Sequence, residues 1–243
     1  MDTTRKLKGR ILKLLQSKDL DAGLKELLKL PIKRAVNTLI PLFYHNNKEI
    51  RWKAITAIGV AVANLAERDM ESARIIMRRF IWNLNDESGG IGWGSPEAMG
   101  EVMACHEGLA KEYSHILVSY LQKGCNFLEF ELLQRGVIWG VGRLAQVRPH
   151  LIKDAAYYLL PHLESNDAII RGLSAWTLGF LRADHISSQL ESLLCDKEEV
   201  ELYIDRKLQL YYVCDLAKEA LLSTDKQVSC KIEQIKLHCP VIL

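Results

Sequence analysis

Apolar residues recur three and four positions apart along most of the chain, the spacing that places side chains on one face of an α-helix. Pro41 and Pro161 lie inside two of these stretches, where we expect them to kink or end the helix. The pattern predicts helices over residues 3–16, 20–29, 32–44, 48–67, 70–84, 96–108, 112–122, 127–146, 149–163, 168–182 and 186–194. The chain is therefore predicted to be mainly helical.

Residues 200–213 carry a second pattern. Val200, Leu202 and Ile204 alternate with other side chains, and a similar alternation resumes after the pair Asp205-Arg206. Alternation with a period of two on both sides of a short polar turn predicts a β-hairpin. The same residues also align an apolar stripe at helical spacing, so a helix remains an alternative. We favour the hairpin.

One motif opens several of the predicted helices, each time after a polar turn. Residues 51–59 and 171–179 both run from an arginine, through small and apolar residues at helical spacing, to a glycine. A third copy, residues 135–142, reaches its glycine one position earlier. The distances between the copies fit a repeat of about 40 residues, which is typical of units of two helices.

The motif, a polar turn followed by R-x-x-A-x-x-A-[IL]-G, resembles the HEAT-like repeats of bacterial proteins related to phycobilisome lyase subunits. The resemblance covers about residues 30–222 and is most specific in the first and last copies. It implies an all-α fold, an α-α superhelix of the HEAT/armadillo solenoid type, with a small C-terminal β-hairpin and a helix over 214–222. We expect one solenoid over residues 1–222 and a tail, residues 223–243, that caps it.

Each helix pair of a solenoid leaves an apolar face that only the next pair can cover. Small residues in the motif allow neighbouring helices to approach closely. The arginine that opens each copy can reach the turn of a neighbouring repeat. We therefore assign a structural role to Arg51, Arg135 and Arg171.

Residues 82–97 interrupt the repeat and contain four glycines within six positions. The connection is longer than the usual turn between two helices, and such loops often carry function. At its end, Ser95 is predicted to cap the next helix, with Pro96 and Glu97 in the first turn. The candidate ligand- or partner-binding residues are Trp82, Asn85, Asp86, Glu87, Gly89, Gly90, Trp93, Ser95, Glu97 and Glu101.

Several roles are open for these residues. The carboxylates can hold a hard cation, although their spacing is not that of an EF-hand. They can also act as a general acid and base beside the tryptophans, in a pocket that raises a carboxyl pKa. In a purely structural role, Arg74, Arg78 and Arg79 pair with the carboxylates while the tryptophans pack the loop. A phosphate site is disfavoured, because the glycine spacing is wrong and the carboxylates repel anions.

The composition is that of an ordinary globular protein, with 49% hydrophobic residues, 26% charged residues and a net charge of +2. Only 15 glycines and 6 prolines disfavour an all-β fold. The chain shows neither a membrane-length apolar run nor a secretory leader, so we expect a cytoplasmic protein. Six cysteines without a C-x-x-C pair indicate reduced, mostly buried thiols. No motif calls for a metal or a cofactor.

No recognisable catalytic constellation accompanies these features. We therefore expect a non-catalytic scaffold or adaptor that binds a protein partner through its concave helix face and the glycine-rich loop 85–95. The alternative is an enzyme or enzyme subunit, either resembling a chromophore lyase or resembling the HEAT-like DNA glycosylases. A basic concave surface with exposed Trp139 and Trp176 would favour DNA, whereas the low net charge disfavours nucleic acid.

Overall fold

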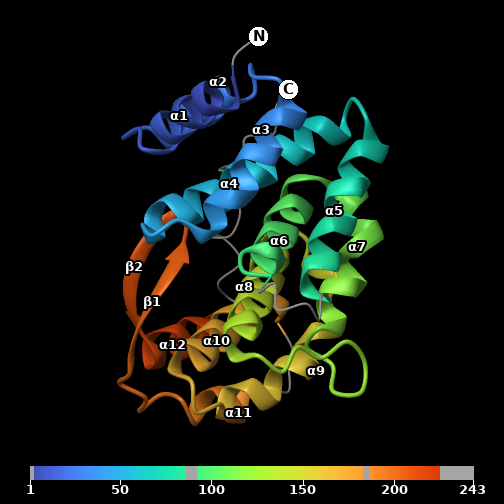
Figure 1. Cartoon of the computed structure of the whole chain (residues 1–243). Helices are drawn as coiled ribbons and strands as arrows, with labels where there is room; N and C mark the ends of the chain where they lie inside the picture. Colours follow the sequence, from blue (N-terminus) through green and yellow to red (C-terminus); the bar gives the residue numbers. More distant parts are fainter. Residues whose placement is uncertain (1–2, 86–91, 183–186, 225–243) are drawn as a thin grey trace. The chain divides into compact units, whose positions relative to one another are not determined.

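The computed structural model describes residues 3–85, 92–182 and 187–224 (Figure 1). The chain divides into two compact units, Met1–Leu109 and Ala110–Leu243. Each unit has its own buried apolar core. Both units are built almost entirely of helices, as the hydrophobic pattern predicts, and the all-α fold class is confirmed.

The first unit contains six α-helices and one 3₁₀ turn among its described residues, and a seventh helix begins within it. Its elements are α1 (Thr4–Leu15), α2 (Leu20–Leu27), α3 (Ile32–Leu39), η1 (Ile40–Tyr44), α4 (Lys48–Ala66), α5 (Met70–Leu84), α6 (Ser95–Cys105) and the start of α7 (Glu107–Ser119). Helix α4 packs against α3, α5 and α6, and it is buried on nearly all sides. A helix that is apolar all round is an interior helix, so α4 forms the centre of this unit.

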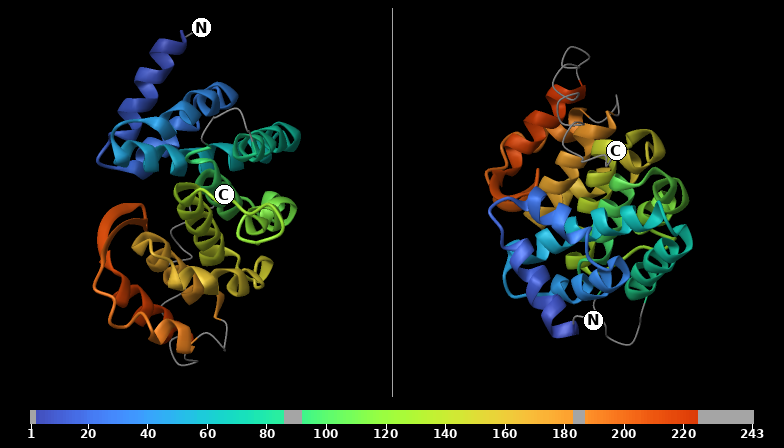
Figure 2. Two further views of the ribbon diagram at one scale, coloured as in Figure 1. Left: turned by 60° about the horizontal axis from the view of Figure 1, so that its bottom comes forward. Right: turned by 90° about the horizontal axis from the view of Figure 1, so that it is seen from above.

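The second unit begins within α7 and includes the predicted hairpin. Its further elements are α8 (Glu131–Val147), η2 (Pro149–Leu151), α9 (Ala155–Leu159), η3 (Leu160–Glu164), α10 (Ala168–Leu181), α11 (Ser187–Glu191), β1 (Glu199–Ile204), β2 (Lys207–Tyr212) and α12 (Val213–Thr224). Helix α10 packs against both α8 and α12, so it is the central helix of this unit (Figure 2). The copies of the repeat motif thus lie in the interior helices α4, α8 and α10.

The glycine that ends each motif copy faces the next interior helix. A Cβ atom at Gly59 would clash with Glu101 of α6, and one at Gly142 would clash with Trp176 of α10. At Gly179 it would lie 3.1 Å from the Cα atom of Ala220 in α12. The missing side chain therefore brings helices of successive repeats together, as the sequence predicts.

The hairpin is present, which decides between the two alternatives for residues 200–213. Strands β1 and β2 are antiparallel, with Glu199 opposite Tyr212 and Ile204 opposite Lys207. The turn residues Asp205 and Arg206 both have positive φ angles, 50° and 62°. Two positive φ values in a two-residue turn are the signature of a type I′ hairpin.

Two predicted helices are interrupted at prolines, as expected for Pro41 and Pro161. The expected helix over 149–163 is instead a 3₁₀ turn at Pro149, the short helix α9 and a second 3₁₀ turn that contains Pro161. The helix expected over 32–44 changes to a 3₁₀ turn at Ile40, directly before Pro41. Proline lacks the N–H group that an α-helix needs in its interior, which accounts for both breaks.

Three further expectations are corrected by the structure. The helix predicted over 127–146 begins only at Glu131, and the one over 186–194 is reduced to Ser187–Glu191. Four described cysteines are free thiols, but Cys125 and Cys195 are exposed rather than buried. Across residues 3–85, 92–182 and 187–224, none of the helices is both long and apolar enough to span a membrane.

Candidate functional site

The centre of the predicted glycine-rich loop lies outside the described residues. This applies to Asp86, Glu87, Gly89 and Gly90, whose role in binding stays a prediction. The remaining candidates flank the loop on α5 and α6. Asn85 is the exposed C-cap residue of α5.

The start of α6 differs from the prediction, because Gly94 rather than Ser95 is its N-cap residue. Gly94 has φ +78°, a conformation that favours glycine, and a Cβ atom there would clash with the ring of Phe43. Ser95 is the first helical residue and is buried. Its Oγ atom lies 3.5 Å from the Nδ2 atom of Asn83 instead of capping the helix.

The two tryptophans of the loop have different environments. Trp82 lies on α5 with two thirds of its surface exposed, while Trp93 stacks on Tyr44 with a ring-centroid distance of 6.3 Å. Both Trp93 and Tyr44 remain partly exposed. The stacked pair therefore presents an aromatic surface on the first unit.

Glu97 is the most perturbed carboxyl group beside the loop. Its Oε2 atom is buried and has no hydrogen-bond partner among the described residues. Burial raises the pKa of Glu97 to about 7, although backbone hydrogen bonds at Glu97 and Gly94 and the charge of Arg51 act in the opposite direction. A carboxyl group with such a pKa can exchange a proton near neutrality.

Glu101, one turn further along α6, is buried against Gly59 of α4. The Sγ atom of Cys105 lies 3.9 Å from its Oε1 atom. Glu101 thus contributes to the contact between two interior helices. Throughout the described part of the chain, no group of three or more histidine, cysteine, aspartate or glutamate side chains is arranged to hold a metal ion.

The arginines of α5 have partners on α5 itself and on α3. Arg78 forms an ion pair of 2.6 Å with Glu71, and Arg74 lies 3.5 Å from the same carboxylate. Arg79 donates a hydrogen bond of 3.1 Å to Asn37. These contacts stabilise α5 and its packing. Pairing of the same arginines with the loop carboxylates stays a prediction, because Asp86 and Glu87 lie outside the described residues.

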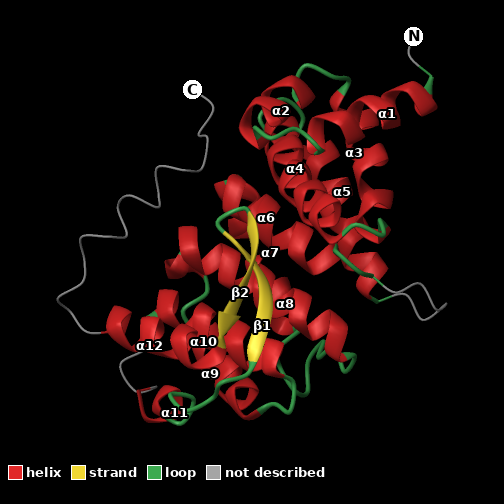
Figure 3. Cartoon of the chain, turned by 90° about the vertical axis from the view of Figure 1, so that its left-hand side faces the viewer, coloured by secondary structure: helices red, strands yellow, loops and turns green. Residues whose placement is uncertain are grey.

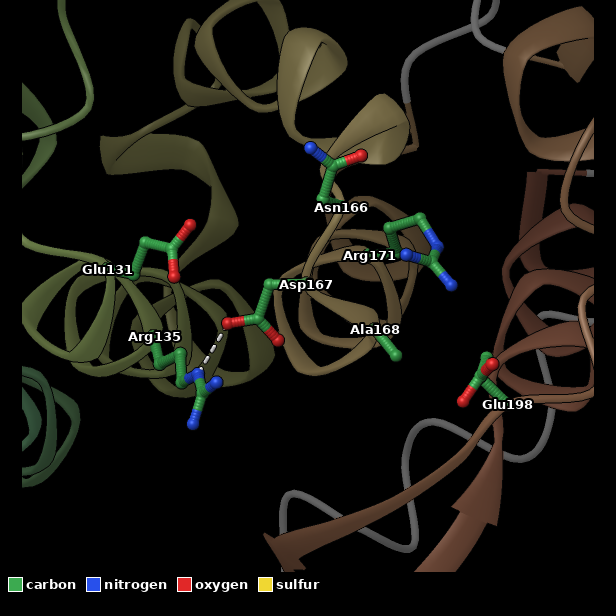
Figure 4. Close-up of a pocket in the computed structure, with 7 residues that line it drawn as sticks. All are labelled: Glu131, Arg135, Asn166, Asp167, Ala168, Arg171 and Glu198. Carbon is green, nitrogen blue, oxygen red and sulfur yellow. Dashed lines mark hydrogen bonds and ion pairs between the residues drawn. The ribbon is translucent and has the colours of Figure 1, made fainter.

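A second candidate, a shallow and open pocket of about 440 Å³ on the second unit, was not anticipated from the sequence (Figure 4). It is formed by the start of α8, the turn before α10, the first turns of α10 and the segment before β1. Its lining residues are mainly charged or polar: Glu131, Arg135, Asn166, Asp167, Ala168, Arg171 and Glu198.

Two motif arginines organise this pocket. Arg135 donates from Nε to Oδ2 of Asp167 over 2.6 Å. Arg171 donates from Nε to Asp196 over 2.7 Å and from Nη1 to the carbonyl oxygen of Ser165 over 2.8 Å. Asp167 also caps α10 by accepting a hydrogen bond from the N–H group of Ile169. Each arginine therefore ties an interior helix to the turn that precedes the next element, the bridge expected from the motif.

The charges of the pocket are only partly neutralised. The carboxylates of Glu131 and Glu198 have no hydrogen-bond or ion-pair partner among the described residues, and neither do the two Nη groups of Arg135. Glu131 and Glu198 stand at opposite sides of the pocket in Figure 4. With both aspartates already paired to arginines, the two glutamates give the pocket an excess of negative charge.

The two tryptophans whose exposure would have favoured DNA are buried in the second unit. Trp139 is 3% exposed and Trp176 is 8% exposed, so neither presents a ring face to a base. Trp139 instead donates a hydrogen bond of 2.7 Å to the carbonyl oxygen of Tyr203 in β1. Trp176 packs edge-on against Phe180. Both rings belong to the core.

Comparisons with known proteins agree with this architecture. Residues 131–181, from α8 to α10, match a family described as HEAT-like repeat. An uncharacterized protein from Archaeoglobus fulgidus is 25% identical over 182 residues, which cover 74% of this chain and 92% of that protein.

Solved structures provide a further comparison. The chain aligns with an engineered protein with a TM-score of 0.53 and 16% identity, covering 92% of this chain and 97% of the other. It also aligns with a designed armadillo repeat protein, solved in complex with the peptide (KR)4, with a TM-score of 0.50, 16% identity and coverage of 88% and 98%. The chain is thus an α-helical repeat protein of the HEAT/armadillo fold class that contains a HEAT-like repeat at residues 131–181.

Proposed function

We propose that the chain is a non-catalytic repeat scaffold that binds a protein partner. The observation that carries this proposal is the polar pocket between α8, α10 and β1, because two of its carboxylates lack partners among the described residues. Repeat folds offer extended surfaces on which such pockets form a series of contacts. The designed armadillo protein of similar fold is in complex with a peptide, which supports the same use here.

The charge of the pocket indicates the chemistry of the partner. Asp167 and Asp196 are compensated by the motif arginines, whereas Glu131 and Glu198 are available to lysine or arginine side chains. The Nη groups of Arg135 can donate hydrogen bonds to the carbonyl oxygens of an extended backbone. A basic, extended peptide segment therefore fits the pocket best. The (KR)4 peptide of the designed protein belongs to that class.

A second contact with the partner is proposed at the glycine-rich loop 85–95, as part of a concave binding face. The exposed ring of Trp82 and the Trp93–Tyr44 pair support this assignment, since aromatic side chains are enriched at protein interfaces. A partner that uses this surface should bind less tightly to a Trp93→Ala variant. Tyr157→Ala, which removes an exposed ring from the second unit, is the matched control.

The pocket can be tested with a fluorescent (KR)4 peptide titrated against the full chain at low and at physiological salt. We expect the double variant Glu131→Gln, Glu198→Gln to bind about tenfold more weakly, which corresponds to about 1.4 kcal/mol. The matched control is Glu191→Gln, Glu219→Gln, which removes the same charge at exposed positions outside the pocket. Equal weakening in both doubles, or absence of binding by the wild type, would contradict the proposed pocket.

A further inference from the structure

Neither strand of the β-hairpin has a strand partner on its outer edge in the described chain, but Tyr203 on the β1 edge accepts a hydrogen bond from Trp139. The sheet has only two described strands, and β1 is the one that packs against α10. In Figure 1, β2 lies on the side of β1 that faces away from α10, and Figure 3 shows the two strands side by side. Strand β2 also packs against α12, the helix that follows it. Among the described residues, no strand covers the outer edge of β2, so this edge can pair with another strand.

The turn determines which backbone groups lie on that edge. In a two-residue type I′ hairpin, the residues that flank the turn, here Ile204 and Lys207, form a hydrogen-bonded pair. Hydrogen-bonded and non-hydrogen-bonded pairs then alternate along the strands. The N–H and C=O groups of Leu208, Leu210 and Tyr212 consequently point away from β1.

The side chains of the same residues make this edge apolar. Leu210 is 62% exposed and Tyr212 is about half exposed. Natural edge strands are usually protected by charges, prolines or bulges. In β2 the sole charged residue is Lys207, at the start of the strand, and its pairing with β1 is regular. The edge thus has the features of a pairing surface.

We propose that β2 pairs in antiparallel fashion with β2 of a second copy of the chain, forming a four-stranded sheet. A two-fold axis at Leu210 places Leu208 of one copy opposite Tyr212 of the other, and Leu210 opposite Leu210. All three outward-facing residues then form hydrogen-bonded pairs. The apolar side chains meet one another, and Lys207 lies outside the paired stretch.

The strand is self-complementary in this register, which favours a second copy over an unrelated strand. A two-fold interface needs one surface that matches itself, and β2 meets this condition with apolar pairs and no pair of like charges. The paired surface is small, so the dimer is expected to be weak and to depend on protein concentration. This inference is independent of the proposed function, because the pocket residues lie outside β2.

Sedimentation equilibrium of the full chain over a wide concentration range tests the dimer. We expect the wild type to shift from monomer to dimer, and Leu210→Lys to remain monomeric at every concentration. The matched control is Leu222→Lys, which places the same charge at a similarly exposed leucine of α12, 59% exposed. It should dimerise as the wild type does. A monomeric wild type, or equal loss in both variants, would overturn the proposal.

Hydrogen exchange locates the contact without any substitution. At high protein concentration, the amides of Leu208, Leu210 and Tyr212 should exchange more slowly than at low concentration. The amides of Gln209 and Tyr211 already bond to β1 and should change little. A dimer in which the three outward amides exchange at the same rate as in the monomer would place the interface elsewhere and refute the pairing of β2.

Discussion

Two acidic residues of this chain, Asp196 and Glu97, have pKa values that are shifted in opposite directions. Arg171 and Asp196 are both largely buried and joined by a hydrogen bond of 2.7 Å. Burial acts to raise the pKa of Asp196, but the hydrogen bonds from Arg171 and from the N–H group of Glu198 together lower it. Glu97 shows the opposite balance, because burial prevails and its pKa is raised.

Substitution of Arg171 should show how much its ion pair with Asp196 contributes to the stability of the fold. We expect Arg171→Met to destabilise the fold by about 2 kcal/mol near neutral pH, since Asp196 would lose a charge-assisted hydrogen bond. The lowered pKa of Asp196 means that the pair stabilises the fold above the unfolded value of about 4, and that this contribution is lost as pH falls through the folded pKa.

Chemical denaturation of wild type and Arg171→Met at about pH 7 and at about pH 3.5 checks the expectation. The gap in unfolding free energy should narrow at the lower pH. Lys153→Met, at an exposed lysine, controls for the loss of a positive charge and should leave stability nearly unchanged. A gap that stays constant with pH would show that Asp196 does not carry the effect.

Glu97 leads to the reverse pH dependence. Its folded pKa of about 7 lies above the unfolded value, so the folded state holds the extra proton and loses stability as pH rises from about 5 to about 8. The change is at most about 3 kcal/mol for a shift of this size. Glu97→Gln, which keeps a neutral side chain, should flatten this dependence.

Thermal unfolding of wild type and Glu97→Gln across this pH interval provides the measurement. We expect the variant to be the more stable protein at about pH 8 and to lose that advantage at about pH 5. Glu164→Gln changes an exposed carboxylate in the same way and should follow the wild type. Parallel pH profiles for wild type and Glu97→Gln would refute the raised pKa.

At the scale of the elements, the hairpin is held by a specific contact with α8 as well as by its turn. The hydrogen bond from Trp139 to the carbonyl oxygen of Tyr203 is buried, and the two rings also pack at a centroid distance of 6.3 Å. A buried carbonyl oxygen that loses its hydrogen-bond donor still carries the free-energy cost of desolvation, with no hydrogen bond to offset it. This interaction therefore fixes β1 to an interior helix.

Comparing two conservative substitutions isolates that hydrogen bond. Trp139→Phe should destabilise the fold by about 1 to 2 kcal/mol more than Trp176→Phe, because both shorten a buried ring but only Trp139 donates a hydrogen bond to β1. Urea unfolding gives the two differences, and the near-ultraviolet spectrum verifies that each variant folds. Equal losses would mean that the Tyr203 contact adds no stability beyond packing.

The sequence contained enough information to predict most elements but not the pocket. The motif around Arg135 and Arg171 is local, so its bridges could be anticipated from the helix start and the polar turn. The placement of Glu131 and Glu198 on opposite sides of one pocket depends on how distant segments pack, and no pattern along the chain encodes it. The sequence did contain one signal of this pocket: Asp167 is an N-cap aspartate four positions before the motif arginine Arg171.

The N-cap residue of α6 is another feature that the sequence alone does not predict. Ser95 is a good N-cap residue followed by proline, so local preference favoured it. Contact with Phe43, a residue from another element, instead requires a glycine with positive φ at position 94, and the helix begins one residue earlier. The elevated pKa of Glu97 is equally a result of burial. Such properties arise from packing between elements and are absent from a linear pattern.

At the scale of the whole molecule, the two compact units raise the question of how far unfolding is shared along the chain. The sequence predicts one solenoid over residues 1–222, and the structure contains two compact units, Met1–Leu109 and Ala110–Leu243. In repeat proteins stability is carried by each repeat and its immediate neighbours. A defect in one interior helix should therefore weaken its own unit first.

Leu178→Ala tests this prediction, because Leu178 is fully buried in α10, at the centre of the second unit. The cavity should cost about 3 kcal/mol. Hydrogen exchange should become faster at residues 110–182 and 187–224, while the slowest amides of residues 3–85 keep their protection. Leu39→Ala, at a fully buried leucine of α3, should give the reciprocal result. If either variant lowers protection equally in both units, the chain unfolds as one cooperative solenoid, and the boundary at Leu109 has no energetic meaning.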